Sequence, residues 1–417
     1  MTRRIFAFSL PVLLAGLVLV CCSGPSEPGG ADYSVLPRQL TPEEIELAQS
    51  SDRFGLKLFR ETVRQDADKN IFISPLSVSM ALGMTANGAA GSTLDSMRTT
   101  LELAGLTEEE SNAAYQSLIE LLAGADPQVQ FDIANSIWYL SGEPVLADFV
   151  QRSRDYFEAV VQGLDFSDPA AADTINAWVK ENTEGRIEEI VDKPIAKGVV
   201  MFLLNALYFK GTWTYEFDPQ KTRDDQFNLL DGSRVDCRMM EQRSKYPYLV
   251  TDQFQAVDLP YSDGLFSMTI FLPRSTVHVD SLIAQFTPEN WQDWISSLAP
   301  DSGDIQLPKF KLKYMLKMND VLKALGMGIA FDPGADFTRM FQGGGVWIDK
   351  VKHKTFVQVD EEGTEASAVT VVVMIKSAGS GFYMRVDRPF VFVIRERTSG
   401  ALLFMGKIVE PLWEEGQ

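Results

Sequence analysis

The stretch from Val357 to Lys376, VQVDEEGTEASAVTVVVMIK, constrains the fold of this chain more than any other. An alternating pattern that ends at Asp360 predicts a strand, and two acids and a glycine then lead into a tract of small and β-branched residues. That tract stops at SAGSG, the loop from Ser377 to Gly381. The segment therefore has the composition of a buried strand between the flexible ends of a loop.

An ordinary hairpin with a DEEGTE turn is one interpretation of these residues. Hairpin loops usually have about two to five residues, whereas here the chain runs from Gly363 to Pro389 before it enters DRPFVFVI, the next apolar segment. The length favours a long exposed loop.

Two motifs around this loop resemble the serpin family. EEGTEASA, from Glu361 to Ala368, is similar to the proximal hinge of inhibitory serpins, and DRPFVFVI followed by LLFMGKIVEP is similar to the C-terminal signature of that family. Further matches occur in the family's order: NIFISPLS from Asn70, TINAWVKENTEGRIEEIV from Thr174, LLNALYFKGTWTYEFD from Leu203 and LPKFKLKY from Leu307. The resemblance implies an α+β serpin fold, with about nine helices around three β-sheets and an exposed reactive-centre loop at about residues 361–386.

The resemblance also implies a mechanism, in which a protease cleaves the loop and forms an acyl-enzyme with it, and the freed strand inserts into the central sheet. The hinge that starts this insertion would comprise Glu361, Glu362, Gly363, Thr364, Glu365, Ala366, Ser367 and Ala368. Alternate residues of a strand face one side, and those from Thr364 onward are small near the hinge. A bulky or charged leading residue would have to be desolvated first, so this hinge favours an inhibitor over a non-inhibitory ligand carrier or chaperone.

Two bonds are candidates for the cleavage site. Serpins typically cleave after the fifteenth residue counted from the hinge glycine, which implies the bond between Ser377 and Ala378. The loop is about one residue longer than usual, so the bond between Lys376 and Ser377 is the alternative. Cleavage after Ser377 suits elastase-like or subtilisin-like proteases, and cleavage after Lys376 suits trypsin-like ones.

The family's shutter and breach regions also have counterparts here. The shutter, a polar cluster that controls the opening of the sheet, would consist of Ser74, Ser77, Asn205 and His353. A buried polar group without partners costs about 1 to 3 kcal/mol, so we expect these four to satisfy one another. A core network of no functional consequence is the alternative. The breach, where insertion begins, would contain Trp213, Tyr261 and Lys309, with Glu361 paired to Lys309. If exposed, such a pair contributes about 0 to 1 kcal/mol.

Catalytic patterns are scarce in this chain. His278 and His353 are its two histidines, and neither lies in a metal-binding spacing. GxSxG, GxxxxGK[ST] and GxGxxG motifs are missing from the sequence. We therefore expect no enzyme, no cofactor and no metal, with a serine hydrolase built on His353 as the remaining alternative.

The formal net charge of −19 disfavours nucleic acid as a partner. The stretch from Thr107 to Leu122 lies where some serpins carry basic residues for glycosaminoglycans, but it has four Glu and no Lys or Arg. We expect a monomer whose partners are serine proteases, without glycosaminoglycan activation.

The N-terminus is typical of a secretion signal, because MTRR precedes an apolar run from Ile5 to Cys22. LVCC resembles a bacterial lipobox with Cys22 as the lipidated residue, although Cys21 stands where Gly, Ala or Ser is usual. We expect a signal peptide at 1–22, a flexible tether at 23–47 and one serpin domain at 48–412, held outside the cytoplasm by a lipid anchor at the cell surface or in the periplasm, or secreted. An uncleaved signal anchor is the alternative. Cys237 is then the cysteine left in the domain, and we expect it to be buried.

Residue patterns predict several elements of the domain. Apolar residues at helical spacing predict helices that start at Ser51, span 280–298 and span 318–325. The nearly continuous apolar run from Val199 to Trp213 predicts a strand buried on both faces.

Overall fold

The computed structural model describes residues 33–364 and 381–413, and within them the strands form two hydrogen-bonded sheets. The six-stranded sheet has the order β10 (Phe310–Lys317), β11 (Lys352–Val359), β12 (Gly363–Thr364), β4 (Met201–Thr212), β2 (Val129–Leu140) and β3 (Val160–Leu164). Its neighbouring strands are antiparallel except β2 and β3, which are parallel. Gly363 and Thr364 of the predicted hinge thus lie inside this sheet, as the short strand β12.

The second sheet has nine strands in the described chain. Its order is β1 (Ile71–Ile73), β15 (Leu402–Ile408), β14 (Phe390–Glu396), β8 (Phe266–Pro273), β7 (Phe254–Pro260), β6 (Arg234–Val250), β9 (Ala299–Pro308) and β13 (Phe382–Arg385), with β5 (Arg223–Asn228) paired to β6. The resemblance implied three sheets in all. The 17-residue strand β6 pairs with β5, β9 and β7. Because β6 is long enough to belong to two of the three expected sheets, those two sheets are joined by hydrogen bonds into one.

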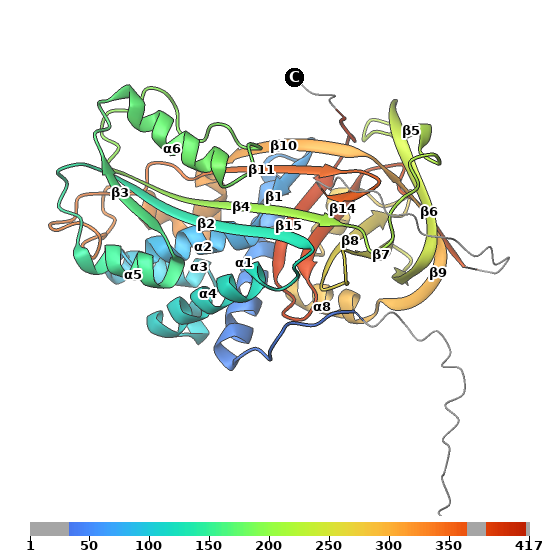
Figure 1. The fold of residues 1–417 in the computed structure, drawn as a ribbon, viewed down its shortest axis with the longest axis horizontal. Coiled ribbons are helices and arrows are strands. Elements are labelled where there is room, and N and C mark those ends of the chain that lie inside the picture. Colours follow the sequence, from blue (N-terminus) through green and yellow to red (C-terminus); the bar gives the residue numbers. More distant parts are fainter. Residues whose placement is uncertain (1–32, 365–380, 414–417) are drawn as a thin grey trace, which may run out of the picture. The chain divides into compact units, whose positions relative to one another are not determined.

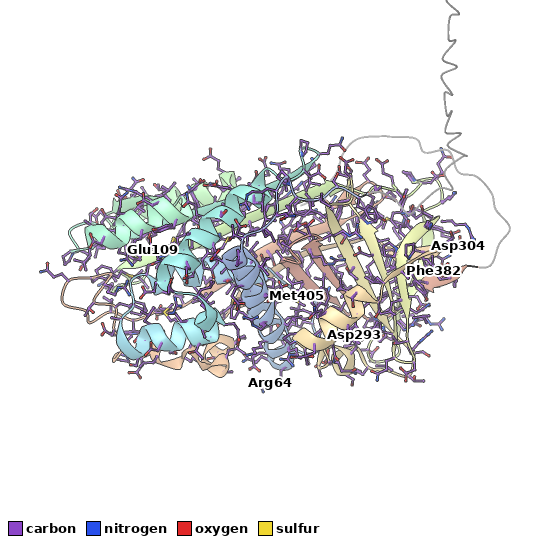
Figure 2. The ribbon with its side chains drawn as sticks, turned by 90° about the horizontal axis from the view of Figure 1, so that it is seen from below. Arg64, Glu109, Asp293, Asp304, Phe382 and Met405 are labelled. Carbon is purple, nitrogen blue, oxygen red and sulfur yellow. The ribbon has the colours of Figure 1, made fainter. Side chains whose placement is uncertain are left out.

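Within the described residues the helices number nine, besides short 3₁₀ and π turns. They are α1 (Pro42–Gln65), α2 (Pro75–Ala86), α3 (Gly91–Thr100), α4 (Glu108–Ala123), α5 (Ala147–Phe157), α6 (Pro169–Glu181), α7 (Val279–Ile283), α8 (Pro288–Ser296) and α9 (Asn319–Leu322). In Figure 1, α6 lies on one face of the six-stranded sheet and α1 to α5 lie on the other. A small apolar core that includes Trp138 and Ile175 fills the α6 side, while Met405 (Figure 2) is fully buried in the main core.

Helix α1 begins at Pro42, nine residues before the predicted start at Ser51. Thr41 caps it, since its side chain accepts a hydrogen bond from the backbone of Glu44 while the Glu44 carboxylate accepts one from the backbone of Thr41. Upstream, Leu36 is buried against the core. The folded part of the chain therefore begins before residue 48, and residues from Tyr33 onward, placed in the tether by sequence, belong to the compact unit. Residues 1–32, including Cys22, lie outside the described part.

Two predicted helices are interrupted in the structure. The 280–298 stretch divides into α7 and α8, because Thr287 caps a new helix whose first residue is Pro288. The 318–325 stretch is helical only to Leu322 and then continues in a π turn through Gly326, whose φ of 113° is outside the helical region.

Candidate functional site

The hinge strand β12 lies between β11 and β4. Thr364 pairs with Val359 on one side and with Gly211 on the other, and Gly363 pairs with Thr212. A Cβ at position 363 would lie 2.1 Å from the carbonyl oxygen of Gly211, so this close approach requires glycine. Thr364 is buried, with 2% of its surface exposed. Gly363 and Thr364 thus already occupy one end of the place that an added strand would take in the intact chain.

Trp213 and Tyr261 contact this short strand from the adjoining turn. Their rings stack with centroids 4.5 Å apart and planes at 14°. The Tyr261 hydroxyl oxygen lies 2.6 Å from Oγ1 of Thr364. Trp213 donates its backbone N–H to the carbonyl of Glu362 at 2.9 Å and its indole Nε1–H to the carbonyl of Asp360 at 3.0 Å. The turn before β12 is therefore fixed by both the backbone and the ring of Trp213.

The carboxylate of Glu361 accepts hydrogen bonds from two sides. Lys309 Nζ lies 2.6 Å from Oε2, and Thr222 Oγ1 lies 2.7 Å from Oε1. Burial would raise the pKa of Glu361, but these two hydrogen bonds outweigh it and hold the pKa below its usual value. The side chains of Lys309 and Glu361 are only 18% and 11% exposed. The pair is thus largely buried, and losing one partner would leave a buried charge, which costs about 3 to 5 kcal/mol.

Beyond the hinge, β4 and β11 each have an edge without a strand partner among the described residues. From Met201 to Lys210, β4 pairs with β2 alone, and from Lys352 to Gln358, β11 pairs with β10 alone. The start of β4 is only half-buried, contrary to the prediction of a strand buried on both faces, because no described strand lies along this edge. We call the place between these two edges the slot.

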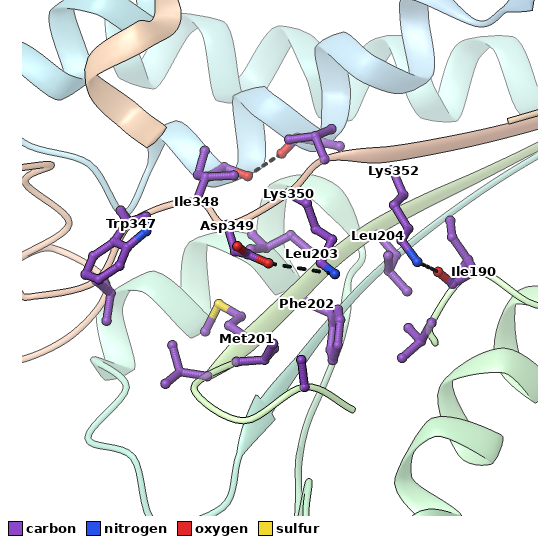
Figure 3. Close-up of a pocket in the computed structure, with 18 of the residues that line it drawn as sticks. Ile190, Met201, Phe202, Leu203, Leu204, Trp347, Ile348, Asp349, Lys350 and Lys352 are labelled. Atoms are coloured by element: carbon purple, nitrogen blue, oxygen red, sulfur yellow. Dashed lines mark hydrogen bonds and ion pairs between the residues drawn. The ribbon is translucent and has the colours of Figure 1, made fainter. Parts of the chain in front are cut away.

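A cavity of about 210 Å³ lies at the far end of the slot from the hinge. The first residues of β4, including Met201 and Phe202, form one wall, and Trp347 and Ile348 form another (Figure 3). Lys352 donates a hydrogen bond to the carbonyl of Ile190 at 3.3 Å across it. Ser77, Asn205 and His353 also line the cavity.

His353, the predicted shutter histidine, accepts a hydrogen bond from one of its predicted partners, Ser74. The backbone N–H of Ser74 donates to His353 Nε2 at 2.9 Å, while the Ser74 hydroxyl donates to the carbonyl of Leu403 at 2.7 Å and accepts from the backbone of Ser77 at 3.3 Å. Since Nε2 is an acceptor, the proton of the neutral ring is at Nδ1. Burial lowers the pKa of His353 to about 4, so the ring is neutral at physiological pH.

Asn205 departs from the expected network. Its Nδ2 donates to Oδ1 of Asn135 on the neighbouring strand β2 at 2.8 Å, and its own Oδ1 has no hydrogen-bond partner in the part of the chain that the structure describes. Ser74, Ser77 and His353 are therefore linked, but Asn205 is not joined to them, because Asn205 on β4 and His353 on β11 lie on two edges that have no strand between them in the described residues. Asn135 was not predicted from the sequence, because it reaches this position only through the register of β2 and β4, which places it opposite Asn205.

The remaining predicted site residues are outside the described part: Glu365, Ala366, Ser367, Ala368, Lys376, Ser377, Ala378 and Cys22. Within residues 33–364 and 381–413, no three His, Cys, Asp or Glu side chains gather as metal ligands, and no helix has the length and apolar character to cross a membrane. Cys237 is buried, and burial raises its pKa to about 11.

Comparison with known proteins decides the family. The model of the serpin family (serine protease inhibitors) matches residues 49–411. The chain belongs to the serpin family. Human neuroserpin is 32% identical over 82% of this chain and 87% of the relative, and serpin-ZXA of Oryza sativa subsp. japonica is 35% identical over 83% and 91%.

Solved serpin structures agree with the described fold. The native state of tengpin, a thermophilic serpin, superposes with a TM-score of 0.80 at 32% identity and covers 89% of this chain and 95% of its own. Human thyroxine-binding globulin superposes with a TM-score of 0.81 at 28% identity over 88% and 99%. The α+β serpin fold predicted from the motifs is confirmed.

Proposed function

We propose that this serpin is an irreversible inhibitor of extracellular serine proteases. The catalytic serine of the protease attacks the carbonyl carbon of Ser377, or in the alternative register that of Lys376; the peptide bond breaks, the next residue leaves as a new N-terminus, and the protease is left as an acyl-enzyme on the loop. The freed strand then inserts along the slot, and the attached protease is displaced before it can deacylate. The observation that carries this proposal is the position of Thr364, buried between β11 and β4, which beyond it have no strand partner on these edges among the described residues.

A non-inhibitory, ligand-binding serpin is the second candidate. The cavity of about 210 Å³ at the slot and the similarity to thyroxine-binding globulin, solved in complex with thyroxine, favour it. The hinge argues against it, because EEGTEASA has small residues where an inserting strand needs them.

One gel distinguishes the candidates. The purified domain is mixed with elastase, subtilisin and trypsin and analysed under denaturing conditions. An adduct that survives SDS supports inhibition, and N-terminal sequencing of the C-terminal fragment released with it identifies the cleaved bond. Simple cleavage of the loop without an adduct supports the ligand-binding candidate, and hydrolysis of added substrates by the serpin itself would point to an enzyme.

We further propose that the chain is a bacterial lipoprotein attached through Cys22. The apolar run before LVCC supports this. Radiolabelled fatty acid should enter the protein in a bacterial host and be absent from Cys22→Ala. Label retained in that variant would move the modification to Cys21, and no label in either would leave a secreted or signal-anchored protein.

A further inference from the structure

The strand register places two of the shutter residues opposite each other across the slot. Thr364 pairs with Gly211 on β4 and with Val359 on β11, and both strands are antiparallel to β12, so they run parallel to each other. Six residues earlier on each strand stand Asn205 and His353, which therefore share one level of the sheet. Because β12 lies between β4 and β11 at the hinge, the two strands are about 9.5 Å apart there, twice the usual spacing. No strand of the described chain joins them at the level of Asn205.

The inner end of the cavity at the slot presents one hydrogen-bond acceptor and one donor. Asn205 and His353 both line this cavity. Oδ1 of Asn205 is buried and has no hydrogen-bond partner within the described residues, so it is free to accept. The neutral ring of His353 accepts from Ser74 at Nε2 and has its proton at Nδ1, for which the described part of the chain supplies no acceptor. One hydroxyl group between the two side chains can accept from Nδ1 and donate to Oδ1, which satisfies both.

The walls of the cavity are mainly apolar. A dry apolar cavity of about 150 Å³ is large enough to bind benzene. The cavity here measures about 210 Å³ and thus has room for a body of about two fused rings. Trp347 is 47% exposed, so its ring lies at the outer end, as Figure 3 shows. The apolar side chains come from α2, the start of β4 and the segment before β11, and they include Leu82, Met201, Phe202, Leu203, Leu204 and Trp347.

Charges at the mouth of the cavity balance each other. The charged side chains that line it in the described chain are Asp192, Asp349, Lys350 and Lys352. Lys352 Nζ lies 2.6 Å from Oδ1 of Asp192, and Lys350 Nζ lies 3.8 Å from one carboxylate oxygen of each acid. Both acids have side chains that are 68% exposed, so these pairs are at the surface. An ionised ligand would find no opposite charge at the inner end and would lose its hydration there.

We propose that this cavity is a binding site for an uncharged, mainly apolar alcohol of about two fused rings. Its hydroxyl lies between Asn205 and His353, and its rings extend to Trp347. In the proposed inhibitory mechanism the inserting strand brings Thr370, six residues after Thr364, to the same level of the slot. The bound alcohol therefore opposes insertion, and water has time to hydrolyse the acyl-enzyme and release cleaved serpin. This effect on insertion rests on the proposed function, whereas the binding itself does not.

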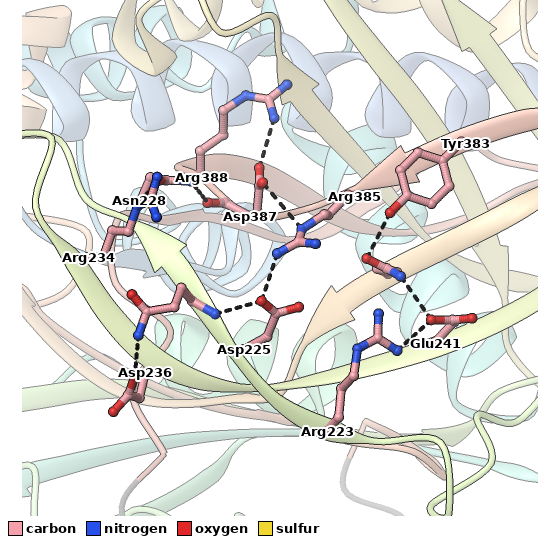
Figure 4. A network of polar contacts seen from close by, with 12 residues as sticks. Arg223, Asp225, Asn228, Arg234, Asp236, Glu241, Tyr383, Arg385, Asp387 and Arg388 are labelled. Carbon is pink, nitrogen blue, oxygen red and sulfur yellow. Dashed lines mark hydrogen bonds and ion pairs between the residues drawn. The ribbon is translucent and has the colours of Figure 1, made fainter.

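Calorimetric titration of the intact serpin with 2-naphthol tests the site. Naphthalene is the same body without the hydroxyl, and 2-naphthoate has a charged group in its place. Trp347→Ala removes the ring at the mouth, and Asn205→Leu removes the acceptor with a side chain of similar size. Tyr383→Ala is the matched control, because Tyr383 is an aromatic residue with 54% exposure on β13 of the other sheet, where its hydroxyl donates to Gln306 (Figure 4).

We expect one molecule of 2-naphthol to bind per chain, about tenfold more tightly than naphthalene or 2-naphthoate, because it makes two further hydrogen bonds. Asn205→Leu should bind the two neutral molecules about equally, and its binding of naphthalene shows that the cavity is intact. Trp347→Ala should bind both molecules several-fold more weakly than Tyr383→Ala does. The site would be overturned if wild type did not bind 2-naphthol or showed no preference over naphthalene, if Asn205→Leu kept the preference, or if Trp347→Ala bound as tightly as the control.

A second measurement tests the effect on insertion. Elastase, subtilisin and trypsin react with the serpin with and without saturating 2-naphthol, and a synthetic peptide of residues 369–380 shows whether the alcohol acts on the protease itself. We expect the ratio of adduct to cleaved serpin to fall several-fold. An unchanged ratio at saturation would disprove the effect on insertion. If wild type forms no adduct even without 2-naphthol, the proposed function fails, and the titration still decides the binding site.

Discussion

The hydroxyl oxygens of Tyr261 and Thr364 lie 2.6 Å apart, and they join the turn after β7 to the second residue of the short strand β12. Both residues are buried. Burial raises the pKa of Tyr261 well above its usual value, so the hydroxyl keeps its proton and stays a donor over the physiological range. The hydrogen bond between Tyr261 and Thr364 thus helps to fix the end of the slot at which insertion would start.

Removing this hydrogen bond should loosen the hinge. Tyr261→Phe is expected to lower the free energy of unfolding by about 1 kcal/mol, because it leaves the buried Thr364 hydroxyl without this partner. Urea-induced unfolding measures the loss. In a Thr364→Val background the same tyrosine change should cost much less, and equal costs in the two backgrounds would show that the two hydroxyls are not coupled.

Thr364→Arg should convert the inhibitor into a substrate. The register partners of Thr364, Val359 and Gly211, carry no negative charge, and burying an unpaired guanidinium costs several kcal/mol. The loop should therefore be cleaved at the wild-type rate without forming an SDS-stable adduct, as a gel of timed reactions would measure. Thr364→Val is the size-matched control and should keep the adduct. Undiminished adduct formation by Thr364→Arg would contradict insertion from this end.

The family and much of the fold could be predicted from the sequence, because serpin motifs are short stretches of consecutive residues. The turn before β12, for example, follows from EEG: Gly363 is needed for its approach to Gly211, and Glu361 reaches Lys309. The early start of α1 was also visible in TPEE, a capping box, but the polar residues around it resembled a tether.

Long-range register was harder to predict. The depth to which Thr364 enters the sheet depends on pairing with Gly211, a residue far away in the chain, and no local pattern fixes such a register. The same limit explains Asn205, whose partner is Asn135 on β2 because β11 does not pair with β4 in the described residues. Thr222 was missed for the same reason, since nothing near it in the sequence indicates that it donates to Glu361.

His353 should make the stability of the serpin depend on pH. Its pKa is lowered by burial from 6.5 to about 4, so between these values the unfolded chain binds a proton that the folded chain does not. Stability should consequently fall as the pH falls from 6.5 to 4, by about 2 kcal/mol at pH 5. Urea midpoints at pH 7 and pH 5 test this, with His353→Gln as the control, because it keeps an acceptor for the backbone of Ser74 and does not titrate. The same pH dependence in both proteins would exclude His353 as its source.

Cutting the loop should stabilise the protein, and this tests whether the intact fold is a trapped state. The edges of β4 from Met201 to Lys210 and of β11 from Lys352 to Gln358 have peptide groups without strand partners among the described residues. An inserted strand would pair with both. About ten new ladder hydrogen bonds, at roughly 0.5 to 1.5 kcal/mol each, amount to about 10 kcal/mol.

At about 1 to 2 °C per kcal/mol for a domain of this size, this gain predicts a melting temperature higher by about 10 °C or more after cleavage. A non-target protease would be used to nick the loop at any bond between Val371 and Ala378, and calorimetry would compare nicked with intact protein. The tract from Val369 to Ile375 is rich in valine and lacks proline, so mild heating of the intact protein should also produce polymers linked by loop and sheet. Nicked Thr364→Arg is the matched control and should gain little, because its leading residue opposes insertion. A nicked wild-type protein that melts at or below the temperature of the intact one would mean that the loop does not insert, and the inhibitory mechanism would then have no source of driving energy.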